Sequence, residues 1–169
     1  MFLDHFKIEF LNQVLSDTTD IQILRSKTEL ISNFGSGYMS PSLPIEGELS
    51  ELHFISESLD EPDTAFIQQQ LKHATSVNLD TLSTYGFQIF DLKGKSKLNH
   101  SYKSIVEYAD SINMITDNYS FLKFTIPIFN KNQNLAYMRF QRGSSGEAII
   151  LEKIEDHWIR KIKLYEWME

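Results

Sequence analysis

Residues 121–167 read FLKFTIPIFNKNQNLAYMRFQRGSSGEAIILEKIEDHWIRKIKLYEW, and they hold the clearest pattern in the chain. Apolar and β-branched side chains form runs there, separated by short clusters of Asn, Gly, Ser and acidic residues. Polar clusters at this spacing are typical of hairpin turns between antiparallel strands. The pattern predicts a four-stranded meander over residues 121–129, 135–141, 147–154 and 158–167.

The first of these strands alternates apolar and polar side chains, which predicts that one face of the sheet is buried. Pro127 lies within it and cannot donate a ladder hydrogen bond, so we expect this strand to lie at an edge or to contain a bulge. Trp158 and Trp167 are nine residues apart on the last strand, and hence on opposite faces. We expect one to lie in the core and the other to face a partner or a helix.

The residues that precede this sheet read mainly as helical, because apolar positions recur there at steps of three and four. Gly and Pro between residues 34 and 44 indicate a connection and a candidate hinge. The expected elements are a helix from Phe2 to about Ser16, a helix from Ile21 to Ile31 with Asp20 as its N-cap, a helix that starts at Asp60–Asp63 and runs to about Ala74, a strand from Tyr85 to Leu92, and a short helix over Ile105–Ile112.

The size of the chain and its composition indicate one α+β domain over residues 1–169. Its helical N-terminal half should pack on a C-terminal antiparallel sheet of about four to five strands. The 169 residues include 41% hydrophobic and 12% aromatic side chains, enough for a packed core. There are no cysteines, which excludes disulfides, thiolate zinc sites and a cysteine nucleophile. No apolar run approaches the roughly 20 residues that span a bilayer. As written the chain is expected to be soluble and cytoplasmic, or exported or lipid-anchored if a signal was removed.

Negative charge is concentrated in one region of the chain. The formal net charge is -7, yet residues 28–71 contain eight acidic residues and neither Lys nor Arg. Such a region disfavours nucleic acid as a partner, because phosphate backbones are bound largely by Lys and Arg. It predicts instead a docking face for a basic protein, or simply a solvated surface with charged helix ends. The residues expected to form that acidic face are Glu46, Glu48, Glu51 and Glu57.

No spacing among the polar residues indicates a metal, a cofactor or a catalytic motif. The five histidines occur neither as His-x-His nor as His-Glu-x-x-His. His53 lies between Glu51 and Glu57, which could join it in an oxygen-rich site. Asp60, Glu61 and Asp63 surround Pro62, which favours helix capping over a calcium loop. Residues 142–146 contain Arg142 and could bind an anion, but a hairpin turn explains their Gly and Ser.

Several segments together resemble the C-terminal signature of a group of uncharacterised bacterial proteins. These are Phe124–Asn130, Ala136-Tyr137, the Gly-containing loop, Leu151–Lys153 and Trp158-Ile159. The helix start at residues 63–70 also resembles one that is common in that group. Many of its members resemble exported, lipid-anchored proteins, and the group has no established activity. Relatives often carry cysteines in the Gly-rich turn, where this chain has serines, so the resemblance implies a fold and leaves function open.

Three functions are therefore compatible with the sequence. The first is a non-catalytic bacterial interaction module, such as an immunity-type protein, that binds a basic protein through the acidic region or the exposed sheet face. The second is a small hydrolase with a cleft between helices and sheet, in which His53 or His100 would lie beside a carboxylate. The third is a ligand-binding domain lined by the Phe-rich strands. The oligomeric state is not specified by any of these patterns.

Overall fold

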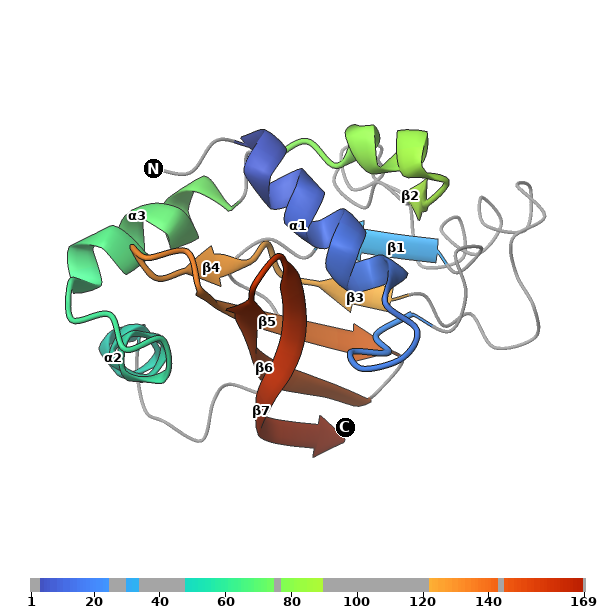
Figure 1. Ribbon diagram of the computed structural model, residues 1–169. Helices are drawn as coiled ribbons and strands as arrows, with labels where there is room; N and C mark the ends of the chain where they lie inside the picture. Colours follow the sequence, from blue (N-terminus) through green and yellow to red (C-terminus); the bar gives the residue numbers. More distant parts are fainter. Residues whose placement is uncertain are drawn as a thin grey trace, which may run out of the picture.

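A computed structural model describes residues 4–24, 30–33, 48–74, 77–89, 122–142 and 145–168, and Figure 1 shows their arrangement. Helices occupy most of the described N-terminal half, and antiparallel strands fill the C-terminal part, so the fold is α+β. In chain order the elements are α1 (Asp4–Ser16), β1 (Leu30–Asn33), α2 (Glu48–Ser58), α3 (Thr64–His73), the 3-10 helix η1 (Asp80–Tyr85), β2 (Gln88–Ile89), β3 (Leu122–Phe124), β4 (Ile128–Phe129), β5 (Leu135–Arg142), β6 (Ser145–Ile154) and β7 (His157–Met168).

The strands form one sheet in the order β2-β1-β3-β5-β6-β7, and β4 also pairs with β5. The pairs from β3 and β4 through β7 are antiparallel, which confirms the expected C-terminal hairpins. β1 joins β2 and β3 in parallel, however, and this extension of the meander was not expected. Parallel neighbours need long crossover connections, so no local hairpin signal marks them.

The expected first strand is interrupted around Pro127. It is divided into β3 and β4, and both pair with β5. Thr125–Pro127 lie between them, where a residue without an N–H costs no ladder hydrogen bond. β3 is not at an edge, because β1 pairs along its other side. Both expectations for this segment are therefore met in part, because the strand is interrupted at Pro127 and β4, which follows it, pairs only with β5 among the described strands.

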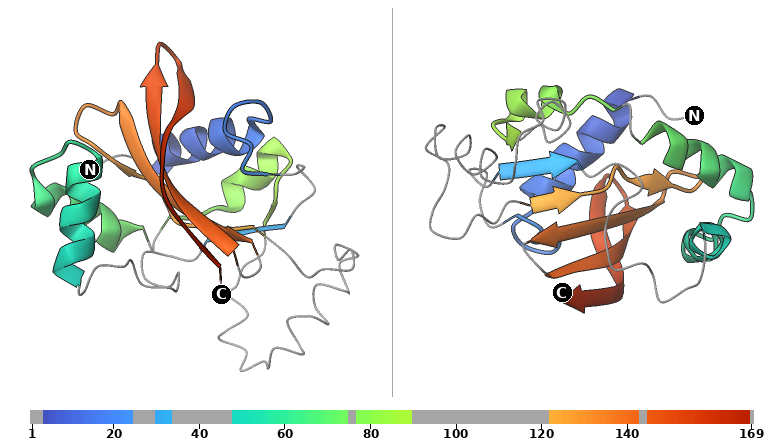
Figure 2. Two further views of the ribbon diagram at one scale, coloured as in Figure 1. Left: turned by 90° about the horizontal axis from the view of Figure 1, so that it is seen from below. Right: turned by 180° about the vertical axis from the view of Figure 1, so that it is seen from behind.

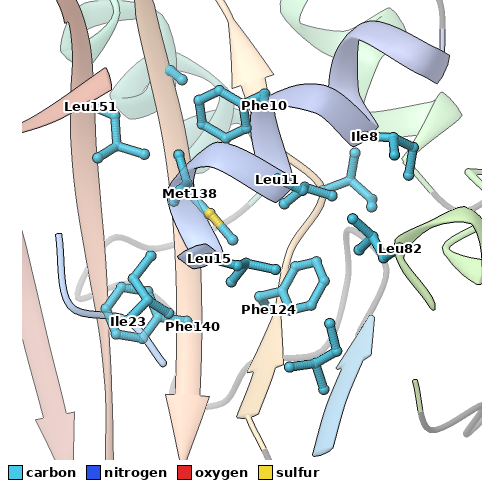
Figure 3. Packing of buried hydrophobic residues seen from close by; sticks show 14 of the residues in the cluster. Ile8, Phe10, Leu11, Leu15, Ile23, Leu82, Phe124, Met138, Phe140 and Leu151 are labelled. Carbon is cyan, nitrogen blue, oxygen red and sulfur yellow. The ribbon is translucent and has the colours of Figure 1, made fainter. Parts of the chain in front are cut away.

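Helix α1 covers one face of the sheet and forms the larger part of the core. Its apolar side chains pack against inward-facing residues of β3, β5 and β6, as Figure 3 shows for Leu11, Met138 and Phe124. The ring of Phe10 lies 4.9 Å from that of Phe129 and 4.8 Å from that of Trp158, both edge-on. Trp158 is 6% exposed, so it is the tryptophan that the pattern assigned to the core. The side chain of Trp167 lies outside the described residues.

Helices α2 and α3 cover the opposite face, so the sheet lies between two helical layers (Figure 2, left). Ile55, Leu59 and Ile67 are fully buried there against Tyr137 and Ile150 of the sheet. Residues 135–141 of β5 are all buried, because alternate side chains point to the two covered faces. The alternation expected for the first strand is confirmed in β3, where Leu122 and Phe124 are buried and Lys123 is not, but β5 at the centre of the sheet is buried on both faces.

The helix expected over Ile21–Ile31 is wrong where the structure describes it. Asp17 Oδ1 accepts the backbone N–H groups of Thr19 and Asp20 at 2.8 Å each, and this turn ends α1 without starting another helix. Burial opposes the ionised form of Asp17, yet these backbone hydrogen bonds lower its pKa. The chain then continues without regular structure to Leu24, and residues 30–33 form β1.

The other upstream expectations are met to different degrees. α1 and α3 are confirmed, with Asp63 as the N-cap of α3. α2 was not expected, and the strand over residues 85–92 is described only as β2, preceded by η1. The expected connection over residues 34–44 and the helix over residues 105–112 lie outside the described residues. Within the described part, no helix combines the length and apolar character that crossing a bilayer requires.

Candidate functional site

The residues expected to form an acidic face do not all lie free on one surface. Glu46 lies outside the described residues, and Glu48 is the first residue of α2, with no description of its side chain. Glu51 accepts a hydrogen bond from Arg139 at 3.1 Å, and the Arg139 side chain is only 8% exposed. This pair joins α2 to β5 across the sheet face. Glu57 is exposed near the end of α2 and is the one member of the set that is described as free to meet a partner.

The acidic segment after α2 holds the α2–α3 connection on the sheet. The Glu61 side chain is 7% exposed, and its Oε2 accepts the backbone N–H of Lys131 at 2.9 Å. Asp63 accepts the N–H of Phe66 at 3.1 Å as the N-cap of α3, and its Oδ2 lies 2.7 Å from Lys131 Nζ. The Lys131 hydrogen bond and the Phe66 N–H lower the pKa of Asp63, while the pKa of Lys131 is raised by Asp63. These contacts confirm capping as the role of this segment.

Three connections meet at the same end of the sheet because described contacts join them in series. Lys131, in the β4–β5 turn, contacts Glu61 and Asp63 of the α2–α3 connection. The carbonyl of Asn134 in the same turn accepts the N–H of Lys153 at 2.9 Å, next to the β6–β7 turn. The two turns and the α2–α3 connection therefore form one continuous region of surface.

Several carboxylates are exposed in this region, which we call the acidic sheet end. Within the described part of the chain, Glu57, Asp60 and Glu155 are exposed and take part in no ion pair. Asp156 is 97% exposed and reaches Lys153 only at 4.0 Å. The lysine Lys131 is already held by Glu61 and Asp63. Negative charge therefore predominates there. The acidic sheet end comprises Glu57, Asp60, Glu155 and Asp156.

Apolar side chains are exposed beside the acidic sheet end. Ile150 is 1% exposed beneath α2 and α3, whereas Ile162, its cross-strand partner on β7, is 49% exposed. Ile154 lies on the same face as Ile150, since the two are four residues apart on β6, and it is 51% exposed. The half-buried Ile159 pairs with Glu152 between them. We call Ile154, Ile159 and Ile162 the isoleucine strip.

The histidines do not form a catalytic or metal-binding group among the described residues. His5, His53, His73 and His157 are all exposed, and His100 lies outside the described part. No cluster of three or more His, Asp or Glu suited to a metal ion occurs within the described residues. His53 follows Glu51 on α2, but Glu51 is paired with Arg139. The described histidines therefore lack the buried His–carboxylate arrangement that the hydrolase hypothesis requires.

The candidate anion-binding turn at residues 142–146 has Arg139 and Arg142 near it in the sequence, but the structure does not bring these two arginines to one anion. Arg139 and Arg142 are three residues apart on β5, so they point to opposite faces of the sheet. Arg142 donates to the carbonyl of Ile23 at 2.8 Å, and Arg160 donates to the carbonyl of Ile21 at 2.7 Å. Both arginines thus attach the segment after α1 to the sheet. Residues 143 and 144 of this turn lie outside the described residues.

Lys7 is a buried ionisable residue that the pattern did not single out. Its side chain shares the buried stripe of α1 with Leu11 and Val14, and it is 2% exposed. Burial lowers the pKa of the Lys7 amine, and the nearby charge of Asp4 offsets this in part. Burying a lysine stem among apolar side chains is favourable, but desolvating its charge is not.

Sequence reasoning missed the isoleucine strip and the acidic β6–β7 turn, although part of the signal is visible in the sequence. Ile154 is followed directly by Glu155 and Asp156, a visible contrast between apolar and acidic residues. Alternation along β6 could have placed Ile154 on the face of Ile150. It could not have shown where the covering helices end.

The chain matches no family model, no curated protein and no solved structure. The resemblance to a group of bacterial proteins therefore depends on the quoted segments alone, and the geometry of the described residues is the basis for any proposal about function.

Proposed function

We propose that this chain is a non-catalytic protein-binding module whose acidic sheet end holds a basic protein partner. The observation that carries the proposal is the exposure of Glu57, Asp60 and Glu155 without ion-pair partners among the described residues. Nearby lysines are engaged instead: Lys131 with Asp63, and Lys161 with Glu152 at 2.8 Å. The free charge available to a partner at this end is therefore negative.

The acidic sheet end differs from the face expected from the sequence. The earlier set centred on the first half of α2, where Glu51 is neutralised by Arg139. The carboxylates at the far end of α2 and in the β6–β7 turn have no such constraint. Charges of one sign on a surface attract an oppositely charged protein and raise its association rate, an effect that salt screens. An immunity-type protein that neutralises a basic toxin belongs to this class.

The experiment compares two variants with the same change in net charge. The test variant carries Glu57→Lys, Asp60→Asn and Glu155→Lys, and the matched control carries Glu9→Lys, Asp20→Asn and Asp80→Lys at exposed positions elsewhere. Asn is used at Asp60 because its φ of 49° lies in the left-handed region, which Asn tolerates well.

Each protein is immobilised and exposed to lysate of the native organism at low and high salt. We expect the wild type and the matched control to retain the same basic protein at low salt, and the test variant to lose it while keeping its melting temperature. Equal retention by the test variant and the control would show that the acidic sheet end is not the docking surface.

A further inference from the structure

The isoleucine strip lies where the cover formed by the described helices stops. Ile150 on β6 is buried beneath α2 and α3, but Ile162, directly across on β7, is half exposed. The figures agree with this arrangement, since α2 and α3 lie over the β4–β5 side and the β6–β7 hairpin extends past them (Figure 2, left). Among the large apolar side chains that are described, only Tyr85, Ile154 and Ile162 are exposed, so two of the three gather on this one face.

Charge restricts what can cover the strip. Ile154 directly precedes Glu155 and Asp156, so anything that buries this isoleucine also meets the acidic sheet end. In a symmetric dimer the same net-negative surface would meet its own copy, so electrostatic repulsion would oppose that contact. An anionic lipid surface would be repelled by the same charges. A chain with cationic side chains meets no such barrier.

β7 is the last strand of the sheet among the described residues, and its outer edge is a less suitable site for a partner strand than its face. β7 pairs with β6 through two irregularities in register, near Ala148 and near Ile150. It also carries Lys161 and Lys163. Irregular pairing and lysines are features that protect edge strands from pairing with other chains. We therefore assign the contact to the exposed side chains of the strip.

We propose that the isoleucine strip is the apolar centre of the docking surface, and that its occupant is a cationic segment of another protein which places aliphatic side chains on Ile154 and Ile162. This inference rests on the proposed function, because the acidic sheet end supplies the charge that orients the segment. Interfaces commonly combine a desolvated apolar centre with a charged rim. The carboxylates would set association rate and salt dependence, and the isoleucines would set the lifetime of the complex.

Two synthetic peptides of equal charge separate these contributions. One is acetyl-Lys-Ile-Lys-Ile-Lys-amide, and the other replaces both isoleucines by serine. Each is titrated into the 15N-labelled full chain at low salt while amide resonances are followed. We expect the isoleucine peptide to bind about fivefold or more tightly, the gain expected from burying even part of one aliphatic side chain. The shifts should centre on Ile154 and Ile162.

The variant Ile154→Ser/Ile162→Ser should remove the preference for the isoleucine peptide and leave binding of the serine peptide unchanged. Tyr85→Ser, at the remaining exposed large apolar position, should retain the preference. Equal affinity of both peptides for the wild type would overturn the role of the strip while leaving the acidic sheet end in place. Binding of neither peptide would count against both proposals, and a concentration-dependent dimer that the double variant abolishes would assign the strip to a second copy.

Discussion

At the scale of single residues, Gln70 hydrogen-bonds to the open side of β4 much as a neighbouring strand would. Its Nε2 donates to the carbonyl of Phe129 at 2.7 Å, and its Oε1 accepts the N–H of Phe129 at 3.0 Å. Phe129 pairs with Ala136 on its other side, so α3 completes the hydrogen bonding of this short strand. Gln70 is 1% exposed, which means that water cannot replace it.

We predict that Gln70→Ala destabilises the fold because it removes both hydrogen bonds that Gln70 makes to buried backbone groups of Phe129, at about 1–3 kcal/mol for each. Gln70→Glu should be destabilising at neutral pH, since a carboxylate cannot donate to the Phe129 carbonyl, and should recover in part in acid. Gln69→Ala, at the exposed neighbouring position, should change stability by less than about 0.5 kcal/mol. Urea unfolding of the three variants tests this, and a mild Gln70→Ala would contradict it.

Lys7 should make stability depend on pH in the alkaline range. The folded chain holds a Lys7 pKa below 10.5, so the unfolded chain binds more protons between the folded pKa and 10.5. Stability should therefore rise with pH across that window. Lys7→Met should keep the packing of the aliphatic stem, abolish this rise and stabilise the protein at neutral pH, because it removes the cost of burying a charge.

Melting temperatures between pH 7 and 11 measure the effect of Lys7. Lys7→Arg is the informative contrast, because a guanidinium stays charged and should destabilise the fold at every pH in that range. If Lys7→Met melts below the wild type at neutral pH, the amine must have a stabilising partner, and the burial argument would be wrong.

At the scale of elements, α3 is attached to the sheet at both of its ends. Asp63 caps its first turn and contacts Lys131, and Gln70 contacts β4 near its last turn. Because the pKa of Asp63 is lowered in the folded chain, its contribution is complete above the unfolded value and is lost as pH falls through the folded value. The first turn of α3 should therefore lose its hydrogen bonds in acid before the strands of the sheet do.

We predict that the Phe66 amide reports this loss, since its N–H is the group that Asp63 accepts. Asp63→Ala should speed hydrogen exchange at Phe66 at neutral pH. Asp63→Asn should retain most of the protection, because Asn is also a good N-cap, while removing its dependence on acid. Asp80→Asn, at the exposed start of η1, serves as the control and should leave Phe66 unchanged.

The unexpected helix α2 illustrates how element signals can be present and still be overlooked. Leu52, Ile55 and Leu59 follow at steps of three and four, the spacing of a buried helical stripe. The acidic residues of the same segment, Glu48, Glu51 and Glu57, indicated a docking face instead. The prediction of a helix over residues 21–31 was wrong because apolar residues there have a tertiary and not a helical cause. Ile23 and Leu24 are buried by contacts with the sheet, not by helical periodicity.

At the scale of the whole molecule, the two core clusters share one sheet. Leu11 belongs to the cluster under α1, and Ile55 belongs to the cluster under α2 and α3, and both are fully buried. Adjacent residues of β5 and β6 point alternately into the two clusters. Unfolding of these strands would therefore disrupt both clusters at once. This arrangement leads us to expect one cooperative unfolding unit.

We predict that Leu11→Ala and Ile55→Ala each lower the free energy of unfolding by about 2–5 kcal/mol. Both variants should still unfold in one transition. Circular dichroism and tryptophan fluorescence should give coincident curves for the wild type and both variants. Trp158 lies in the α1 cluster, so part of the fluorescence signal comes from that face. Two separated transitions, each sensitive to one variant, would instead indicate that the faces unfold independently and would argue against a single domain.

The sequence by itself determined the elements whose signals are local. The C-terminal hairpins follow from alternation and turn residues, and α1 and α3 follow from helical spacing and the Asp63 cap. Tertiary structure alone decided that β1 and β2 join in parallel, that Arg139 neutralises Glu51, and that the helical cover ends between β6 and β7. The physical reason is that these outcomes depend on contacts between residues far apart in the chain, whereas periodicity and capping act over a few neighbouring residues.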